Sequence, residues 1–169
     1  GGAGGYYWWW EGQLERSQDR VISMAARRYG MEPALIKAIV WRESHFNPLV
    51  RGRAEEVGLM QLQEEAAREW AEAEHLEDYQ HETCLDPGTN VLAGTWYMRK
   101  LLKRYTQTDN PLPYALADYN AGRANVLKWN RGAAATNSTT FMEQIGFPST
   151  KAYVRAVMGR YEYYRVARR

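Results

Sequence analysis

The stretch PALIKAIVWRESHFNP (residues 33–48) decides the fold class, because its apolar residues recur at the spacing of a helix. A helix over 33–44 would place three aliphatic side chains and the Glu43 carboxyl on one face. The three are Ile36, Ile39 and Val40. A carboxyl held against aliphatic side chains loses hydration of its charged form, so its pKa would rise toward the value that a general acid needs. The alternative is that Glu43 lies at the edge of this stripe and reaches water near the helix end.

The rest of the chain also reads as helices, with almost no strand signal. The helices that we expect are 13–29, 33–44, 63–74, one from Asp86-Pro87 onward, a short one ending in ADYNAG, 124–129 and one from about Ser149. Residues 131–147 are rich in Gly, Ala, Thr and Asn, and we expect them to form an irregular, mobile excursion. At most a small hairpin is expected in the loop at 50–58. These patterns predict an all-α fold.

Length, charge and cysteine content exclude several classes of function. The chain has 169 residues, which predicts one domain, and 22 Lys and Arg against 20 Asp and Glu give no signal for nucleic-acid binding. Cys84 is the only cysteine, so no intrachain disulfide can form. His75, His81 and Cys84 lack the close spacing of metal ligands, and we expect no metal site.

The N-terminal segment joins a glycine-rich start to a cluster of aromatic residues. GGAGG (residues 1–5) is typical of a linker or tag, and YYWWW (residues 6–10) follows it directly. Trp and Tyr gather at the membrane–water interface beside a spanning helix. One hypothesis is that residues 1–12 are a linker or juxtamembrane segment and that the natural chain continues upstream into a membrane anchor. The alternative is that the aromatic segment packs on the domain formed by residues 13–169.

Three short motifs follow one another along the chain. The segments ESHFNP (43–48), GLMQL (58–62) and DYNAG (118–122) resemble the signature segments of the soluble lytic transglycosylases. Two later segments, DPGTNVLAGTWYMRKLL and PSTKAYVRAVM, are similar to downstream helices of that family, and the likeness covers residues 13–165. The resemblance implies a lysozyme-like helical domain with a substrate cleft. It also implies a monomer that needs no cofactor and acts on peptidoglycan glycan strands in the bacterial cell envelope, in the periplasm.

The resemblance implies a reaction as well. Members of the family cleave the β-1,4 bond between N-acetylmuramic acid and N-acetylglucosamine and form a 1,6-anhydro sugar. Glu43 matches their single catalytic acid/base, and Tyr119 matches a residue that lies near the catalytic carboxyl. One carboxyl then serves where ordinary glycosidases use two, because the muramyl C6 hydroxyl supplies the nucleophile.

Further residues match positions that bind substrate in the family. They are Ser44, Met60, Gln61, Gln63, Asn120 and Tyr153. Three of these have an alternative interpretation from the sequence: Met60 as core filling, Asn120 as a helix cap and Tyr153 as packing.

The chain also departs from the family pattern. The departures are Gly52 in place of Ser, Glu55-Glu56 in place of Gly-Ala, Gln63-Glu64 in place of Met-Pro, Ser149-Thr150 in place of Glu-Thr, and Asp118 in place of a small apolar residue. Glu55, Glu56 or Asp118 could position a water, which would make the protein an inverting, lysozyme-like hydrolase (a muramidase). The plainer interpretation is a solvated loop for the two glutamates and an arginine partner for Asp118. A third hypothesis is a murein-binding module of an envelope complex with weakened catalysis.

Overall fold

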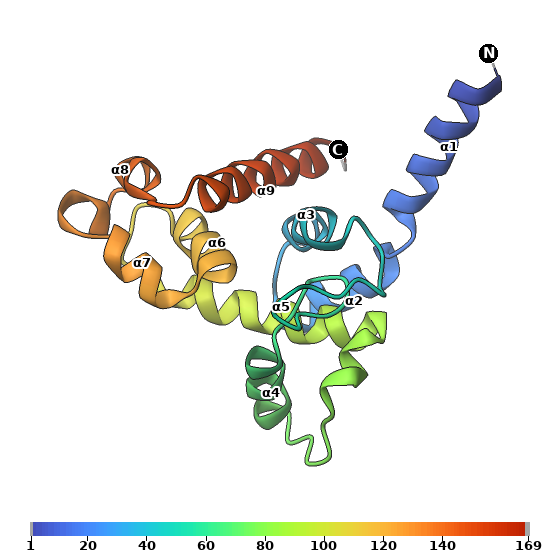
Figure 1. Ribbon diagram of the computed structural model, residues 1–169, viewed down its shortest axis with the longest axis horizontal. Coiled ribbons are helices and arrows are strands. Elements are labelled where there is room, and N and C mark those ends of the chain that lie inside the picture. Colours follow the sequence, from blue (N-terminus) through green and yellow to red (C-terminus); the bar gives the residue numbers. More distant parts are fainter. Residues whose placement is uncertain (1, 168–169) are drawn as a thin grey trace. The chain divides into compact units, whose positions relative to one another are not determined.

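The computed structural model describes residues 2–167, and these residues form helices with no strand (Figure 1). The elements are α1 (Gly2–Arg16), α2 (Asp19–Tyr29), α3 (Pro33–Ser44), α4 (Glu64–Ala73), η1 (His81–Leu85), α5 (Pro87–Arg104), α6 (Pro111–Ala121), α7 (Arg123–Trp129), η2 (Gly132–Ala135), α8 (Ser138–Gln144) and α9 (Pro148–Ala167). Two isolated β-bridges, Arg51 with Val57 and Val57 with Leu62, are the whole of the extended pairing in this described part. The all-α prediction is confirmed, and the substrate cleft stays a prediction.

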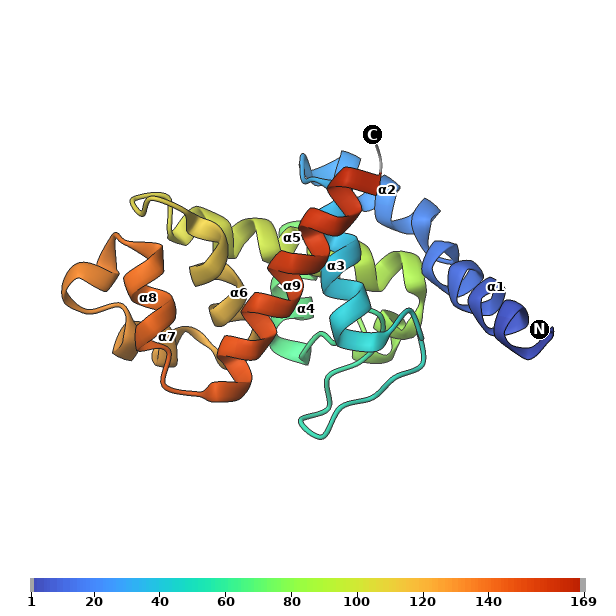
Figure 2. The same ribbon diagram turned by 90° about the horizontal axis from the view of Figure 1, so that it is seen from above.

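The chain divides into two compact units, Gly1–Trp96 and Tyr97–Arg169. In the first unit α2 packs against α3, and α4 packs against η1. In the second unit α6 packs against α7, α8 and α9, and α8 packs against η2 (Figures 1 and 2). No helix within residues 2–167 combines the length and the apolar character that a membrane span requires.

The helix boundaries follow local capping chemistry. Pro33 occupies the first turn of α3, where its missing N–H costs nothing, and Gly30 ends α2 in the left-handed conformation at φ 65°. The Asp86 carboxylate accepts hydrogen bonds from the Thr89 backbone N–H and hydroxyl at 2.9 Å, so it caps α5 as the sequence predicts. The predicted helix over 63–74 is confirmed as α4.

The predicted helix over 13–29 is wrong, because two helices meet there. The Ser17 hydroxyl and backbone N–H both donate to the Leu14 carbonyl, at 2.6 and 3.1 Å, which ends α1 at Arg16. A new helix then starts, with Ile22 N–H donating to the Gln18 carbonyl. The residues between Leu14 and Val21 are all polar or charged, among them Ser17 and Gln18, so the sequence did carry a sign of the break. Residues 2–12 lie in α1, and their role as a linker or tag stays a prediction.

The irregular excursion expected at 131–147 is also wrong, because η2 and α8 occupy this segment. Phe141 is fully buried and stacks on Tyr114, with ring centroids 4.1 Å apart. The Tyr114 hydroxyl donates to the Ala134 carbonyl, and the Asn137 side chain caps α8 by accepting from Thr140 N–H. One aromatic anchor and one cap therefore order a segment whose composition is typical of a loop.

Candidate active site

Glu43 lies in the last turn of α3, and its side chain is half-buried. The three aliphatic residues on its helix face (Ile36, Ile39 and Val40) are all fully buried, as predicted. The carboxyl is therefore carried at the end of a rigid core helix. It sits at the point where the chain turns from the core into the loop at 45–63.

This turn contains strained backbone. His45 and Phe46 follow Glu43 closely and have positive φ angles of 51° and 65°, a region that bulky residues rarely occupy. Among the described residues five non-glycine residues have positive φ, and Glu55 and Gln61 of the same loop are two more of them. Phe46 is buried, which holds the turn in place. Strain of this kind gathers at functional sites, where the surrounding structure over-determines the conformation.

Gln61 holds the GLMQL segment against the preceding part of the loop. Its side-chain nitrogen donates to the Val50 and Gly58 carbonyls, both at 2.9 Å. Both amide hydrogens are thus used inside the protein. The side-chain oxygen is the group of Gln61 that can accept a hydrogen bond from a ligand.

Met60 is fully buried, and its sulfur contacts the position where Gly94 of α5 would carry a Cβ atom. This close approach agrees with core filling, the alternative interpretation from the sequence. The prediction that Met60 binds substrate stays a prediction. Its backbone N–H donates to the Asn90 side chain at 2.8 Å.

Asn90 is a positioning residue that the sequence analysis missed. Its buried amide accepts from Met60 N–H and donates to the Val57 and Cys84 carbonyls, each at 2.8 Å. At Gly58, with φ 77°, a Cβ atom would overlap the Asn90 amide, so only glycine fits there. A signal was available, since Asn90 stands at helical spacing from Met98 and Leu101, two apolar residues of the same helix. A buried amide needs partners.

Ser44 and Gln63 lie at the two ends of the loop between α3 and α4. The buried Ser44 hydroxyl donates to the Val40 carbonyl of its own helix at 3.0 Å. Gln63 is exposed and precedes the first turn of α4. Nothing in these positions tests whether either residue binds substrate, and both roles stay predictions.

Gly52 and Glu56, which both differ from the family pattern, contact each other in the loop. A Cβ atom at residue 52 would overlap the Glu56 carboxylate, so this carboxylate occupies the space of the absent side chain. The Gly52 N–H also donates to the Glu56 backbone carbonyl at 2.8 Å. Glu56 is half-buried, whereas Glu55 is exposed with a φ of 63°. The two glutamates are therefore different, and only the Glu56 side chain is folded onto the loop.

In the second unit, Asp118 is a structural carboxylate. It is 3% exposed and accepts hydrogen bonds from Arg104 at 3.0 Å and from the Tyr105 hydroxyl at 2.5 Å. Burial, reinforced by the bond to Asp118, raises the pKa of Tyr105 well above its usual value of 10.0. The arginine partner expected for Asp118 is thus present. Engaged in this way, the carboxylate is poorly suited to position a water.

Tyr119, Asn120 and Tyr153 lie on α6 and α9 of the second unit. The half-buried Tyr119 ring lies 6.0 Å from the Tyr97 ring. The exposed Asn120 side chain accepts from the buried Thr150 hydroxyl at 2.8 Å, which leaves its NH₂ group directed elsewhere. Tyr153 is buried. The structure thus ties the DYNAG segment to the start of α9.

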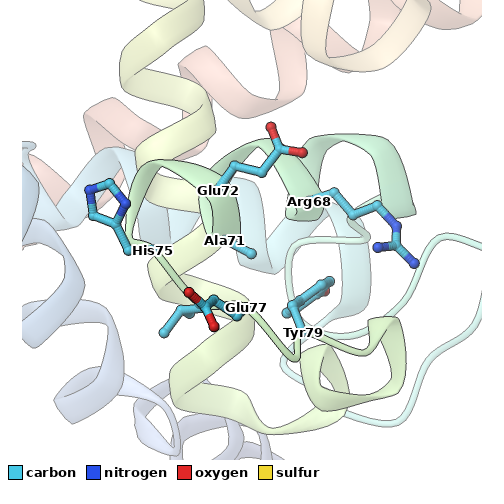
Figure 3. Close-up of a pocket in the computed structure, with 7 residues that line it drawn as sticks. Arg68, Ala71, Glu72, His75, Glu77 and Tyr79 are labelled. Atoms are coloured by element: carbon cyan, nitrogen blue, oxygen red, sulfur yellow. The ribbon is translucent and has the colours of Figure 1, made fainter.

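The first unit contains a pocket of about 330 Å³ (Figure 3). None of the predicted site residues lines it. Its lining comes from α4 and the turn after it: Arg68, Ala71, Glu72, His75, Leu76, Glu77 and Tyr79. Arg68 is engaged with Glu64 through hydrogen bonds at 2.6 and 3.0 Å. Among the described residues, no group of three or more His, Cys, Asp or Glu side chains is arranged to hold a metal ion.

The chain is similar in sequence to proteins named as lytic murein transglycosylases. The soluble lytic murein transglycosylase of Salmonella typhimurium is 34% identical over 130 residues, which is 76% of this chain and 20% of that protein. The membrane-bound lytic murein transglycosylase C of Klebsiella pneumoniae is 35% identical over 114 residues, which is 64% of this chain and 32% of that protein. This chain therefore spans about a fifth to a third of the length of these relatives.

The fold is shared with solved structures. The crystal structure of the 70 kDa soluble lytic transglycosylase of Escherichia coli matches with a TM-score of 0.76 and 27% identity, over 87% of this chain and 24% of that chain. The complex of a 70 kDa soluble lytic transglycosylase with bulgecin A matches with a TM-score of 0.79 and 26% identity, over 91% of this chain and 25% of that chain. The sequence profile described as the transglycosylase SLT domain matches residues 20–142, well over half of the sequence. The chain therefore belongs to the transglycosylase SLT domain family.

Proposed function

We propose that this domain cleaves the β-1,4 bond between N-acetylmuramic acid and N-acetylglucosamine in peptidoglycan, with Glu43 as its single acid/base. The observation that carries the proposal is the position of Glu43. It lies half-buried at the end of a core helix, directly before two residues with strained backbone. Family membership and the names of the relatives, which are lytic murein transglycosylases, support the substrate class.

The proposed reaction has two steps and uses no water. In the first, the protonated Glu43 gives its proton to the glycosidic oxygen while the C1–O bond breaks and its electron pair goes to that oxygen. In the second, the muramyl C6 oxygen attacks C1 and its proton returns to the Glu43 carboxylate. The products are a 1,6-anhydro-muramyl end and a free N-acetylglucosamine end. Tyr119 is proposed to stabilise the positive charge that develops at C1 or to orient Glu43. No metal or cofactor takes part in these steps.

The polar residues suggest how acetamido sugars would be bound. The Gln61 side-chain oxygen is proposed to accept a hydrogen bond from a sugar N–H or hydroxyl, because both hydrogens of its amide are already used. Asn120 is proposed to donate its NH₂ group to an acetamido carbonyl, because its oxygen is occupied by Thr150. The remaining proposed substrate contacts rest on the match to family positions alone. They are Ser44, Met60, Gln63 and Tyr153.

The proposal is tested by digesting purified murein sacculi and analysing the released muropeptides by mass spectrometry. The wild type should release anhydro-muramyl ends, each lighter by one water than a reducing end. Glu43→Gln should lower the rate by about 10²–10⁴-fold or more. Glu65→Gln, which removes an exposed carboxylate from α4, is the matched control and should keep full activity. Equal activity of Glu43→Gln and the wild type would reject Glu43 as the acid.

A second candidate function is hydrolysis, and the position of the Glu56 carboxylate in the space above Gly52 favours it. In this reaction Glu56 would take a proton from a water that attacks C1. The same digestion separates the two candidates. Reducing ends that disappear in Glu56→Gln would establish the muramidase, whereas anhydro ends that persist in that variant would exclude it. Absence of cleavage by both wild type and Glu43→Gln, with sacculi still bound, would instead indicate a binding module.

We also propose a location and an oligomeric state. The substrate lies in the bacterial cell envelope, so the domain is expected to act in the periplasm as a monomer. Relatives of this chain include proteins named as soluble and proteins named as membrane-bound. The aromatic start of the chain favours attachment to the membrane, through a segment upstream of residue 1.

A further inference from the structure

Five consecutive aromatic residues form a collar on α1: Tyr6, Tyr7, Trp8, Trp9 and Trp10. Each is more than half exposed, from 53% for Trp10 to 76% for Trp8. None of the residues described in α1 is buried, and both views show this helix extending away from α2 (Figures 1 and 2). The aromatic rings are therefore not used in the core of the first unit.

The collar surrounds the helix. Successive residues of an α-helix are rotated by about 100°, so five in a row cover the whole circumference. A protein surface, or a flat position on a membrane, would cover only one side of such a helix and leave the opposite rings in water. A ring of aromatic side chains on every side fits a medium that encloses the helix.

The polarity of α1 changes along its axis. Residues 2–10 carry no charged side chain, and charged residues begin directly after the collar, at Glu11, Glu15 and Arg16. The helix thus passes from an uncharged end, through Trp and Tyr, to a charged end. Trp and Tyr combine an apolar face with a hydrogen-bonding edge, which is the chemistry of the layer between lipid headgroups and acyl chains.

We propose that the collar is a lipid-binding site, in which α1 enters the headgroup layer of a phospholipid bilayer end-on with its charged end in water. The inference rests on the proposed envelope location and not on the proposed reaction. Beyond the collar, the Glu11 carboxylate lies 3.9 Å from the His45 imidazole, and His45 caps the helix that carries Glu43. A bilayer at the collar would therefore hold the end of α3 close to the membrane, where it would meet membrane-proximal glycan strands.

The test measures the binding of the full chain to vesicles of phosphatidylethanolamine and phosphatidylglycerol, by co-sedimentation and by the blue shift of Trp emission. Two variants remove the same pair of residue types from sides of the helix that are about 130° apart. Tyr6→Ala/Trp10→Ala changes one side, and Tyr7→Ala/Trp8→Ala changes the other. End-on insertion predicts that both variants weaken binding, each by about tenfold.

A matched control removes exposed apolar side chains elsewhere, in the variant Met24→Ser/Leu127→Ser/Val166→Ser. This control should bind vesicles as the wild type does. Loss of binding in only one of the collar variants would overturn end-on insertion in favour of a flat helix. Absence of vesicle binding by the wild type, or self-association in light scattering that the collar variants abolish, would overturn the lipid proposal. Murein digestion in solution should be unchanged in both collar variants, so failure of the lipid proposal and failure of the proposed reaction are separate outcomes.

Discussion

Asn90 holds the geometry of the loop through three hydrogen bonds. Its one amide satisfies three backbone groups, from Met60, Val57 and Cys84, at positions where water has no access. Leaving buried backbone groups without partners costs more than an ordinary hydrogen bond contributes. The GLMQL segment is therefore held by α5 through Asn90 as well as by the hydrogen bonds of its own Gln61.

Asn90→Ala should lower the free energy of unfolding by about 2–4 kcal/mol, because it leaves buried backbone groups without partners. Murein cleavage should fall as well, even under conditions where the variant is folded, since Gln61 loses its support. Urea unfolding followed by circular dichroism measures the first effect. Asn125→Ala is the control, because the half-exposed Asn125 amide of α7 donates to a single carbonyl, that of Ala121 at the end of α6, and its cost should stay below about 1 kcal/mol. A similar cost for the two variants would contradict the role given to Asn90.

Gly52 and Glu56 should behave as a coupled pair. Gly52→Ala places a methyl group where the Glu56 carboxylate lies, so the variant must expel that side chain. The cost should be smaller when Glu56 is first changed to Ala, because the space is then empty. A double-mutant cycle from urea unfolding should give a coupling free energy of about 0.5–3 kcal/mol. Additive costs would mean that the carboxylate moves aside without penalty.

At the residue scale, the sequence predicted the burial around Glu43 but not the contacts of the loop. Helical spacing is sufficient to place Ile36, Ile39 and Val40 on a buried face. The bonds of Gln61 and Asn90 join residues up to 33 positions apart and depend on how the loop folds back. The family resemblance predicted that Gln61 and Asn120 bind substrate. It did not show which half of each amide is already occupied.

At the element scale, α2 and α4 are joined by one polar network. Glu74, at the end of α4, accepts from the Tyr29 hydroxyl at 2.5 Å and from Arg28 at 2.9 Å. The Trp70 indole N–H donates to the same hydroxyl at 2.9 Å. The Tyr29 hydrogen bond, assisted by the Arg28 charge, holds the pKa of Glu74 below its usual value of 4.5.

Glu74→Gln should therefore destabilise the protein in a pH-dependent manner. A carboxyl whose pKa is lowered by folding stabilises the folded state fully above its unfolded-state value of 4.5, and this contribution is lost as the pH falls through the lower folded-state value. Wild type and variant should differ in stability at neutral pH and converge in acid. Urea midpoints measured across this range provide the test, with Glu72→Gln on the same helix as a control of small effect. A difference that persists unchanged in acid would show that charge is not the cause.

The predicted helix boundaries were correct where a capping residue stood at the point at which the spacing of apolar residues changes. Pro33, Gly30 and Asp86 mark such points, and the observed helices begin or end there. The prediction failed at Ser17, whose hydroxyl helps to end a helix within a run of polar residues between Leu14 and Val21. It failed again at Phe141, where one buried ring orders a segment with the composition of a loop. In both places a single side chain decides the local structure, whereas the prediction rested on the average character of many residues.

At the scale of the whole molecule, the order of the motifs was more informative than any one of them. ESHFNP, GLMQL and DYNAG are each short, and their combination predicted a family to which the chain belongs. The site itself is less predictable, because its chemistry depends on substitutions around the motifs. Asp118 and Glu56 are both added carboxylates in the sequence. One is buried in an ion pair with Arg104, and the other fills the space above Gly52.

Cys84 reports on the integrity of the whole first unit, because it is the only thiol in the chain and is fully buried. Burial raises the pKa of this thiol above its ordinary value of 9.0, and the Tyr79 hydroxyl lies 2.8 Å from the sulfur. Burial is the larger effect and suppresses attack on a disulfide reagent, which requires an accessible thiolate, while the hydrogen bond with Tyr79 offsets part of the rise in pKa. Ellman's reagent should therefore react at least about a thousandfold more slowly with the native protein than with the unfolded chain at the same pH.

The dependence of this rate on urea distinguishes global from local opening. If Cys84 becomes accessible only when the first unit unfolds, the logarithm of the reaction rate should rise with urea in parallel with the unfolding constant from circular dichroism. A rate that is high and independent of urea below the transition would mean that η1 opens by itself. In that case Asn90 would lose its Cys84 partner during each opening, and the loop that carries Gln61 would be mobile in the native state. The hydrogen bond from the Asn90 amide to the Cys84 carbonyl favours the parallel dependence, since opening of η1 would break one of the contacts that hold the loop.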